Sequence, residues 1–262
     1  MAGRLVRVWL AYAAAHVRRI LEYRGSFVLG VAAIASRHAM SLLGLWVLFR
    51  NVRSLGGWSE GEVLFLYGFV SVVTAIWHFF FANTLRMEML VEGELDWYLV
   101  RPLPALFQVL LYYFDDDAIG DLVPGVVLLA WSSHTLGVRY DLPTALALGA
   151  GLAGGVLVHF GIHLAISSWS FWFVKSRALI LVFTETRRFS EYPLRMFAPP
   201  IQLVLSLVVP LAFAGFHASE AVLRGQLATS LAWLSLPVGL AIWLAGMRLW
   251  HHGLSRYQGT GS

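Results

Sequence analysis

The sequence predicts an all-α membrane protein with six transmembrane helices, and three observations lead to this prediction. Of the 262 residues, 58% are hydrophobic and only 13% are charged, whereas a soluble domain is about 45–50% apolar and about 25% charged. The mean hydropathy is +0.70. The apolar residues fall in runs of the roughly 20 residues that cross a bilayer, at about 26–49, 62–85, 118–137, 143–172, 199–217 and 228–250. We expect residues 1–262 to form one membrane domain, which excludes both a water-soluble enzyme and a disordered chain.

The first 24 residues have a different pattern from the six runs. Leu5, Val8, Trp9 and Tyr12 recur at helical spacing beside several arginines, which predicts an amphipathic helix lying in the membrane interface. A signal peptide is the alternative. Its apolar run would be short and followed by arginines, which disfavours it.

Charge gives the expected orientation. With a cytoplasmic N-terminus, fourteen Lys and Arg residues lie inside and four lie outside, namely Arg50, Arg53, Arg139 and Arg224. This bias places both termini in the cytoplasm. The basic pI of about 9.6 therefore reflects topology, and we expect no nucleic-acid partner. The chain has no cysteine, which excludes disulfides and thiolate metal sites.

The segment between the second and third spans carries an ordered charge pattern. Its acidic residues Glu88, Glu92 and Asp96 recur every four residues, and its apolar side is formed by Leu95, Trp97 and Leu99. Pro102 and Pro104 end this short helix. An acidic and apolar surface suits docking to a basic groove of another protein; a solvated connecting loop is the alternative.

Two motifs in the chain resemble a known family. Gly93-Glu-Leu-Asp96 followed by Leu99-Val-Arg-Pro-Leu103 resembles the signature between spans two and three of ABC-2 type ABC-transporter permeases, closest to their six-span subgroup of similar length. Tyr192-Pro-Leu and Val209-Pro-Leu-Ala-Phe213 resemble that subgroup's pattern around span five.

The resemblance implies the permease subunit of an ATP-driven exporter in a bacterial cytoplasmic membrane. Such permeases pair with a sister permease or with themselves, and we expect a heterodimer surrounded by membrane lipids. Each binds a cytoplasmic ABC ATPase subunit through a coupling helix. The N-terminal helix would be the elbow helix, and residues 216–227 would be re-entrant. The chain lacks a G-x-x-x-x-G-K-[ST] phosphate loop, so ATP and Mg²⁺ are expected on the partner and no cofactor on this chain.

The coupling contacts are expected at Glu88, Glu92, Gly93, Asp96, Leu99, Arg101 and Pro102. Glu92 and Asp96 would make the charged contacts, Gly93 would allow close approach, and Arg101-Pro102 would fix the turn.

Residues expected along a substrate pathway are Arg37, His38, Trp77, His159 and His163. A charge inside a span usually faces a cavity or a partner. We expect no Asp or Glu well inside any span, which favours a cavity-lining or inter-subunit role for Arg37 over a structural ion pair. Trp77 belongs to an aromatic run that suits an apolar substrate or plain packing.

The fourth span carries Ala147, Gly151, Gly155, His159 and His163 on one stripe. Its small residues predict close helix packing. Its histidines could pack, line a pathway or bind a metal, and we expect no metal because no third ligand is evident.

Acidic residues 115–117 and Asp121 are expected to be solvated or paired with Arg187 and Arg188, with cation binding as the alternative. No hydrolase motif is present, so we expect no enzyme activity. A stand-alone secondary transporter or channel is the alternative function, followed by a membrane-embedded lipid-modifying enzyme.

Overall fold

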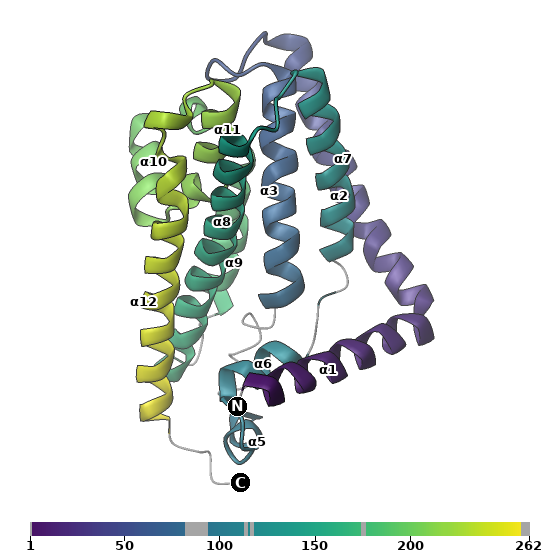
Figure 1. Cartoon of the computed structure of the whole chain (residues 1–262), viewed down its shortest axis with the longest axis vertical. Helices are drawn as coiled ribbons and strands as arrows, with labels where there is room; N and C mark the ends of the chain where they lie inside the picture. The colour runs from purple at the N-terminus through teal and green to yellow at the C-terminus, as the bar shows by residue number, and fades with distance from the viewer. Residues whose placement is uncertain (1, 82–93, 113–114, 116–117, 174–176, 258–262) are drawn as a thin grey trace.

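The computed structural model describes residues 2–81, 94–112, 115, 118–173 and 177–257, and in this part of the chain the regular elements are helices, joined by turns and short loops, with no strand. Figure 1 shows the longer helices running side by side, with both termini, α5 and α6 at one end. The α-helices are α1 (Ala2–Glu22), α2 (Arg24–Asn51), α3 (Glu60–Phe81), α5 (Leu95–Leu99), α6 (Ala105–Tyr112), α7 (Ala118–Thr135), α8 (Leu142–Ser168), α9 (Arg177–Thr186), α10 (Pro199–Leu203), α11 (Phe216–Leu223) and α12 (Ser235–Arg256).

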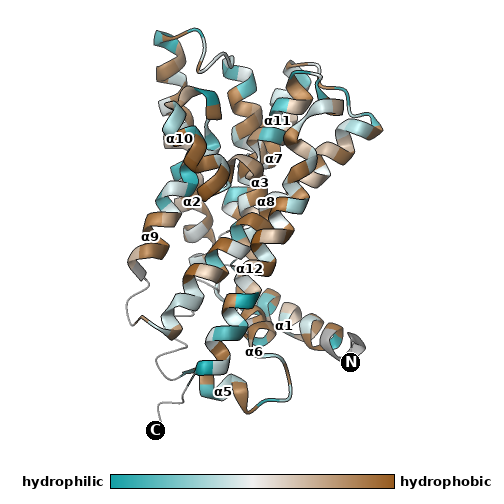
Figure 2. Cartoon of the chain, turned by 90° about the vertical axis from the view of Figure 1, so that its left-hand side faces the viewer, coloured by the Kyte–Doolittle hydropathy of each residue, from teal (hydrophilic) through white to brown (hydrophobic). Residues whose placement is uncertain are grey.

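Four helical stretches in the described residues are long and apolar enough to cross a membrane. They are Arg24–Asn51, Glu60–Phe81, Leu142–Phe171 and Leu231–Arg256, and they coincide with the first, second, fourth and sixth predicted spans. The third predicted span corresponds to α7. Apolar residues are frequent along these helices, and hydrophilic ones are more frequent around α5 (Figure 2). The all-α membrane fold is therefore confirmed, while the total of six spans stays a prediction.

The N-terminal helix α1 is separated from α2 at Tyr23 and runs across the α5 end of the bundle (Figure 1). It approaches the turn after α5, where a cavity of about 200 Å³ separates the two elements. Val8 and Tyr12 line this cavity from α1, opposite Arg101, Pro102, Leu103, Gln108 and Leu111. The elbow helix and the coupling segment expected from the sequence are thus neighbours.

The fifth predicted span, 199–217, is not one continuous helix. This stretch consists of α10, a π-helix over Val204–Val208, and a 3₁₀ helix over Leu211–Ala214. Pro210 cannot donate a backbone hydrogen bond, which explains the interruption before the 3₁₀ helix. The helix α11 then begins at Phe216, within the expected re-entrant stretch 216–227.

The residues that precede α10 also form helical elements. After α9 comes a 3₁₀ helix over Arg187–Glu191, in which Arg187 is buried and donates from Nη1 to Thr74 Oγ1 of α3 at 2.9 Å. At the opposite end from α5, Arg195 pairs with Glu220 of α11 at 2.8 Å. The chain thus runs from α9, which contacts α8, through a 3₁₀ helix that contacts α3, to Arg195 beside α11.

The small stripe of α8 packs closely, as predicted. A Cβ added at Gly151 would meet Ala218 of α11, and one added at Gly155 would meet the backbone of Ala214. A second set of glycines was not predicted: Gly154 and Gly161 of α8 approach the backbone of α12 at the level of its own glycines, Gly239 and Gly246. These two helices meet backbone to backbone.

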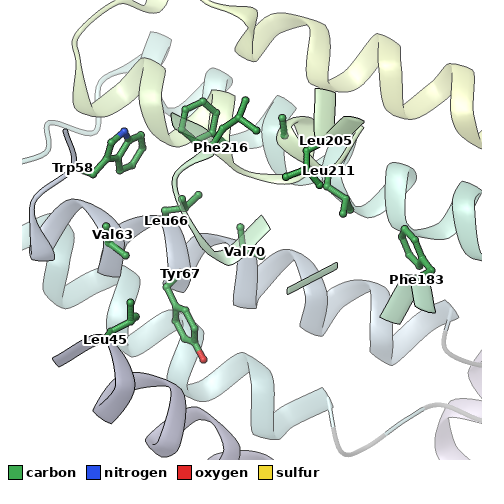
Figure 3. Packing of buried hydrophobic residues seen from close by; sticks show 12 residues of the cluster. Leu45, Trp58, Val63, Leu66, Tyr67, Val70, Phe183, Leu205, Leu211 and Phe216 are labelled. Carbon is green, nitrogen blue, oxygen red and sulfur yellow. The ribbon is translucent and has the colours of Figure 1, made fainter. Parts of the chain in front are cut away.

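The main hydrophobic core packs α3 against the series of short helices over residues 199–223. Trp58, Leu66, Val70, Leu211 and Phe216 are among its buried members, and Figure 3 shows them converging from α3 and from the 3₁₀ and α-helical pieces that follow Pro210. Tyr67 belongs to the same cluster, but its hydroxyl points away from the other labelled side chains (Figure 3).

Candidate functional site

The tip formed by α5 and α6 presents one buried and one exposed face. Leu95 and Tyr98 are buried in a cluster with Leu106 and Val109 of α6 and with Trp250 of α12. A helix of only five residues is not stable alone. The stability of α5 therefore depends on its packing against these neighbours.

Gln108 fixes the turn between α5 and α6. Its buried side-chain nitrogen, Nε2, donates to the carbonyl oxygens of Tyr98 and Leu103, both at 2.8 Å. Tyr98 lies in the last turn of α5 and Leu103 in the loop that follows, so one amide group binds an acceptor on each side of the turn. No local sequence pattern indicates this role of Gln108.

The outer face of the tip is apolar and exposed. The exposed fraction is 71% for Trp97 and 80% for Val100, and Leu99 lies beside them. Such a grouping at the end of a bundle is typical of an interaction surface. Arg101 and Pro102 are exposed in the following turn, and the Arg101 guanidinium lies 5.9 Å from the centre of the Tyr98 ring.

Asp96 faces the end of α12. Partial burial, with the negative charge of Asp96 nearby, raises the pKa of the Tyr257 hydroxyl. Of the predicted coupling residues, Asp96, Leu99, Arg101 and Pro102 come together at this tip, whereas Glu88, Glu92 and Gly93 lie outside the described residues.

A second polar group lies between α2, α3 and α7. Arg37 pairs with Asp121 Oδ1, and His38 Nε2 contacts the same oxygen at 2.8 Å. His38 Nδ1 lies 2.8 Å from the hydroxyl of Tyr67. The Asp121 side chain is 3% exposed. Asp121 lies in the first turn of α7, buried, and pairs with Arg37, so Arg37 has the carboxylate partner from another span that was the alternative to its pathway role.

His78 extends this group toward the α5 end. Its Nδ1 lies 3.5 Å from Asp121 Oδ2, and its Nε2 lies 3.3 Å from Asp115 Oδ2. The expected partners Arg187 and Arg188 do not pair with these carboxylates; Arg187 binds Thr74 and Arg188 pairs with Glu185 at 3.2 Å. The position of Asp121 one helical turn after the triple Asp run is a signal that could have indicated this pairing.

The histidines of α8 form a buried cluster of rings with Trp77. The ring of His163 stacks on Trp77 with centroids 4.1 Å apart, and His159 lies at 5.9 Å. The Nδ1 atoms of His159 and His163 hydrogen-bond to the carbonyls of Gly155 and His159 at 2.9 and 2.7 Å. All three side chains are almost fully buried, so they are packed inside the chain, and their pathway role stays a prediction.

An apolar cavity of about 190 Å³ lies between α3 and α7. It is lined by Ala75, Ile76, Phe79, Phe80, Ala118, Ile119 and Leu122. Two members of the predicted aromatic run thus face a cavity. Within the described part of the chain, no three His, Asp or Glu side chains are arranged to hold a metal ion.

Comparison with known proteins gives one match. The family model described as ABC-2 family transporter protein matches residues 35–261. Searches of curated proteins and of solved structures return no match.

Proposed function

Because the chain belongs to the ABC-2 family of transporter proteins, we propose that it is the permease subunit of an ATP-driven exporter whose ATPase is a separate chain. The family is a transport component of the membrane, which agrees with the chain's hydropathy and with its four long apolar helices. ATP and Mg²⁺ belong to the partner in this proposal, and the permease supplies the path for the substrate.

The exposed apolar tip of α5 supports the proposal most directly. Trp97, Leu99 and Val100 stand at the end of the bundle that carries both termini. The opposite face of α5 is fastened to α6 and α12. A partner that binds this tip therefore gains apolar contact area, and its movement is passed to helices that are packed against the tip.

We propose six crossings, with the fifth at residues 177–196 in place of 199–217. The 3₁₀ helix over Arg187–Glu191 packs against α3, where Nη1 of the buried Arg187 donates a hydrogen bond to Thr74. Residues 199–223 then form a re-entrant hairpin from the outer side of the membrane. The Arg195–Glu220 ion pair joins this hairpin to the fifth crossing, and the Arg224–Glu62 ion pair joins its end to α3. This arrangement keeps both termini cytoplasmic.

A second permease would cover the exposed apolar side of the bundle. Large apolar side chains are exposed along α2 and α10, including Met40, Leu43, Trp46 and Leu203. We propose that a sister permease contacts this side and that the substrate passes between the two chains. The apolar cavity between α3 and α7 suits an apolar part of a substrate that enters from the inner leaflet.

The test is co-purification from native membranes. The wild-type permease should retain an ABC ATPase subunit, and the double variant Trp97→Asp with Val100→Asp should lose it. Phe173→Asp is the matched control, since Phe173 is also a large exposed apolar residue and follows the membrane-crossing stretch Leu142–Phe171. Equal recovery of the ATPase with all three proteins would refute the docking role of the tip, and absence of any ATPase from the wild-type preparation would refute the proposed function.

A further inference from the structure

The cavity of about 200 Å³ between α1 and the turn after α5 has walls of two kinds. Its polar side chains are Tyr12, Arg101 and Gln108. Its apolar side chains are Val8, Pro102, Leu103 and Leu111. Arg101 is the one charged group among these described lining residues, and none of them is Asp or Glu. The cavity therefore suits a group that carries a negative charge and an apolar part together.

The backbone that carries Arg101 is fixed on both sides. The carbonyl oxygen of Arg101 accepts a hydrogen bond from the backbone N–H of Leu103 at 2.8 Å. The amide of Gln108 binds the carbonyls of Tyr98 and Leu103, which lie before and after Arg101 in the sequence. The turn is thus ordered before any ligand binds, which lowers the entropic cost of binding. An exposed guanidinium on such a turn can donate two hydrogen bonds to one phosphate group.

The helix α1 has an apolar face directed away from the cavity. Val6, Leu10, Val17 and Leu21 are exposed and share one face by their helical spacing, whereas Val8 and Tyr12 lie on the other side of the helix and line the cavity. A helix of this kind buries its apolar face at the boundary of the lipid headgroups and acyl chains. The cavity then lies at the level of the headgroups.

We propose that this cavity binds the phosphate of an acidic phospholipid, with Arg101 as the cation that recognises it and Tyr12 as a hydrogen-bond donor from α1. The apolar wall residues would contact the glycerol and the first part of the acyl chains. A free phosphate ion would leave these apolar walls in water, so the lipid is favoured as the source of the phosphate. One bound lipid would join α1 to the turn after α5.

The charge of α1 favours an acidic lipid over a zwitterionic one. Arg7 and Arg18 of this helix are exposed, in addition to Arg101 on the turn. Each basic residue near a membrane surface attracts acidic lipids. A choline headgroup adds a cation beside these arginines, whereas a phosphoglycerol headgroup adds none.

The test is native mass spectrometry of the full-length permease in a neutral detergent, without any ATPase. The protein is titrated with phosphatidylglycerol or with phosphatidylcholine of the same acyl chains. We expect one phosphatidylglycerol to bind more tightly than phosphatidylcholine, and Arg101→Gln to weaken its binding by about tenfold or more, because a charge-assisted hydrogen bond is lost. Arg248→Gln is the matched control, since Arg248 is an exposed arginine of α12 that does not line the cavity.

A second pair of variants tests the cavity while Arg101 is kept. Val8→Trp fills the cavity from α1 and should remove the tight site. Val6→Trp, on the exposed face of the same helix, should retain it. Unchanged binding in Arg101→Gln and Val8→Trp would overturn the proposal, as would equal losses in Arg101→Gln and Arg248→Gln.

Thermal unfolding distinguishes a lipid from a soluble phosphate. A ligand that binds only the folded protein raises the unfolding temperature. Phosphatidylglycerol should therefore raise it for the wild type by more than for Arg101→Gln, whereas inorganic phosphate or glycerol phosphate should leave it unchanged. Equal stabilisation by glycerol phosphate and by the lipid, or equal affinity for the two lipids, would overturn the proposal. No ATPase or transport step enters these measurements, so the lipid site can fail without the proposed function failing.

Discussion

Replacing Gly161 by alanine should force α8 and α12 apart. A Cβ at this position would lie 2.6 Å from the backbone nitrogen of Trp243 and 2.7 Å from the carbonyl carbon of Ile242. Ordinary contact begins near 3.4 Å, so the backbone of α12 would have to recede by about 0.8 Å. Backbone atoms in a helix cannot move singly, and the added methyl group therefore disturbs the whole seam. Overpacking of this kind costs about 1–3 kcal/mol.

The measurement is the thermal unfolding temperature of the purified permease in one detergent, followed by tryptophan fluorescence. Gly149→Ala is the matched control, because Gly149 lies in the same helix and a Cβ there would meet nothing within 4 Å. At such an open position alanine is favoured over glycine by about 0.5–1 kcal/mol. We therefore expect shifts of opposite sign for the two variants. If Gly161→Ala unfolds at the same temperature as Gly149→Ala, the backbone contact between α8 and α12 does not exist.

Three further outcomes follow from contacts described above. Asp121→Ala removes the carboxylate that pairs with Arg37 and should lower the free energy of unfolding by about 3–5 kcal/mol. Alanine at the exposed Glu185 is the control and should change this free energy little. Equal effects of the two substitutions would contradict the buried pair. The carboxylate of Asp141 accepts the N–H of Thr144 at 3.0 Å, which lowers the pKa of Asp141. The stabilising contribution of this cap is therefore present above the unfolded-state pKa of Asp141 and is lost as pH falls through the lower native pKa. Asp141→Ala should therefore show a smaller drop in unfolding temperature on acidification than the wild type. An equal drop in both proteins would mean that the cap is absent. The exposed Arg224–Glu62 pair, with 2.6 Å between Nη1 and Oε1, should contribute no more than about 1 kcal/mol, and Arg224→Gln should lose less stability in 1 M salt than at low salt; a salt-independent loss would count against it.

The parts of the fold that could be predicted are those whose signal is local. A long apolar run gives a helix such as α3 wherever it is placed, because a bilayer leaves no other way to satisfy the backbone. The small stripe of α8 was predictable for a similar reason, since residues four apart share one face of a helix. The turn after α5 followed from Pro102 and Pro104.

The parts that could not be predicted depend on contacts between residues distant in the sequence. Asp121 reads as the end of an acidic loop, and only its approach to Arg37 and His38 makes it a buried partner. In the sequence, Arg187 also looks like a cytoplasmic surface charge. In the fold it is buried inside the bundle and donates a hydrogen bond to Thr74 of α3. Hydropathy also treats 199–217 as one continuous run. It does not register that Pro210 interrupts the backbone hydrogen bonds and lets the chain turn back as α11.

The contact of α5 with α12 joins the two halves of the chain at the tip. Leu95 and Tyr98 pack with Trp250, and α12 is in turn seated on the glycines of α8. A displacement of α5 is carried by side-chain packing into α12 and, through the glycine contacts, into α8. A fluorophore attached just after Arg256 would consequently report the motion of α8, and a crosslink from that point to Trp97 would immobilise both helices at once.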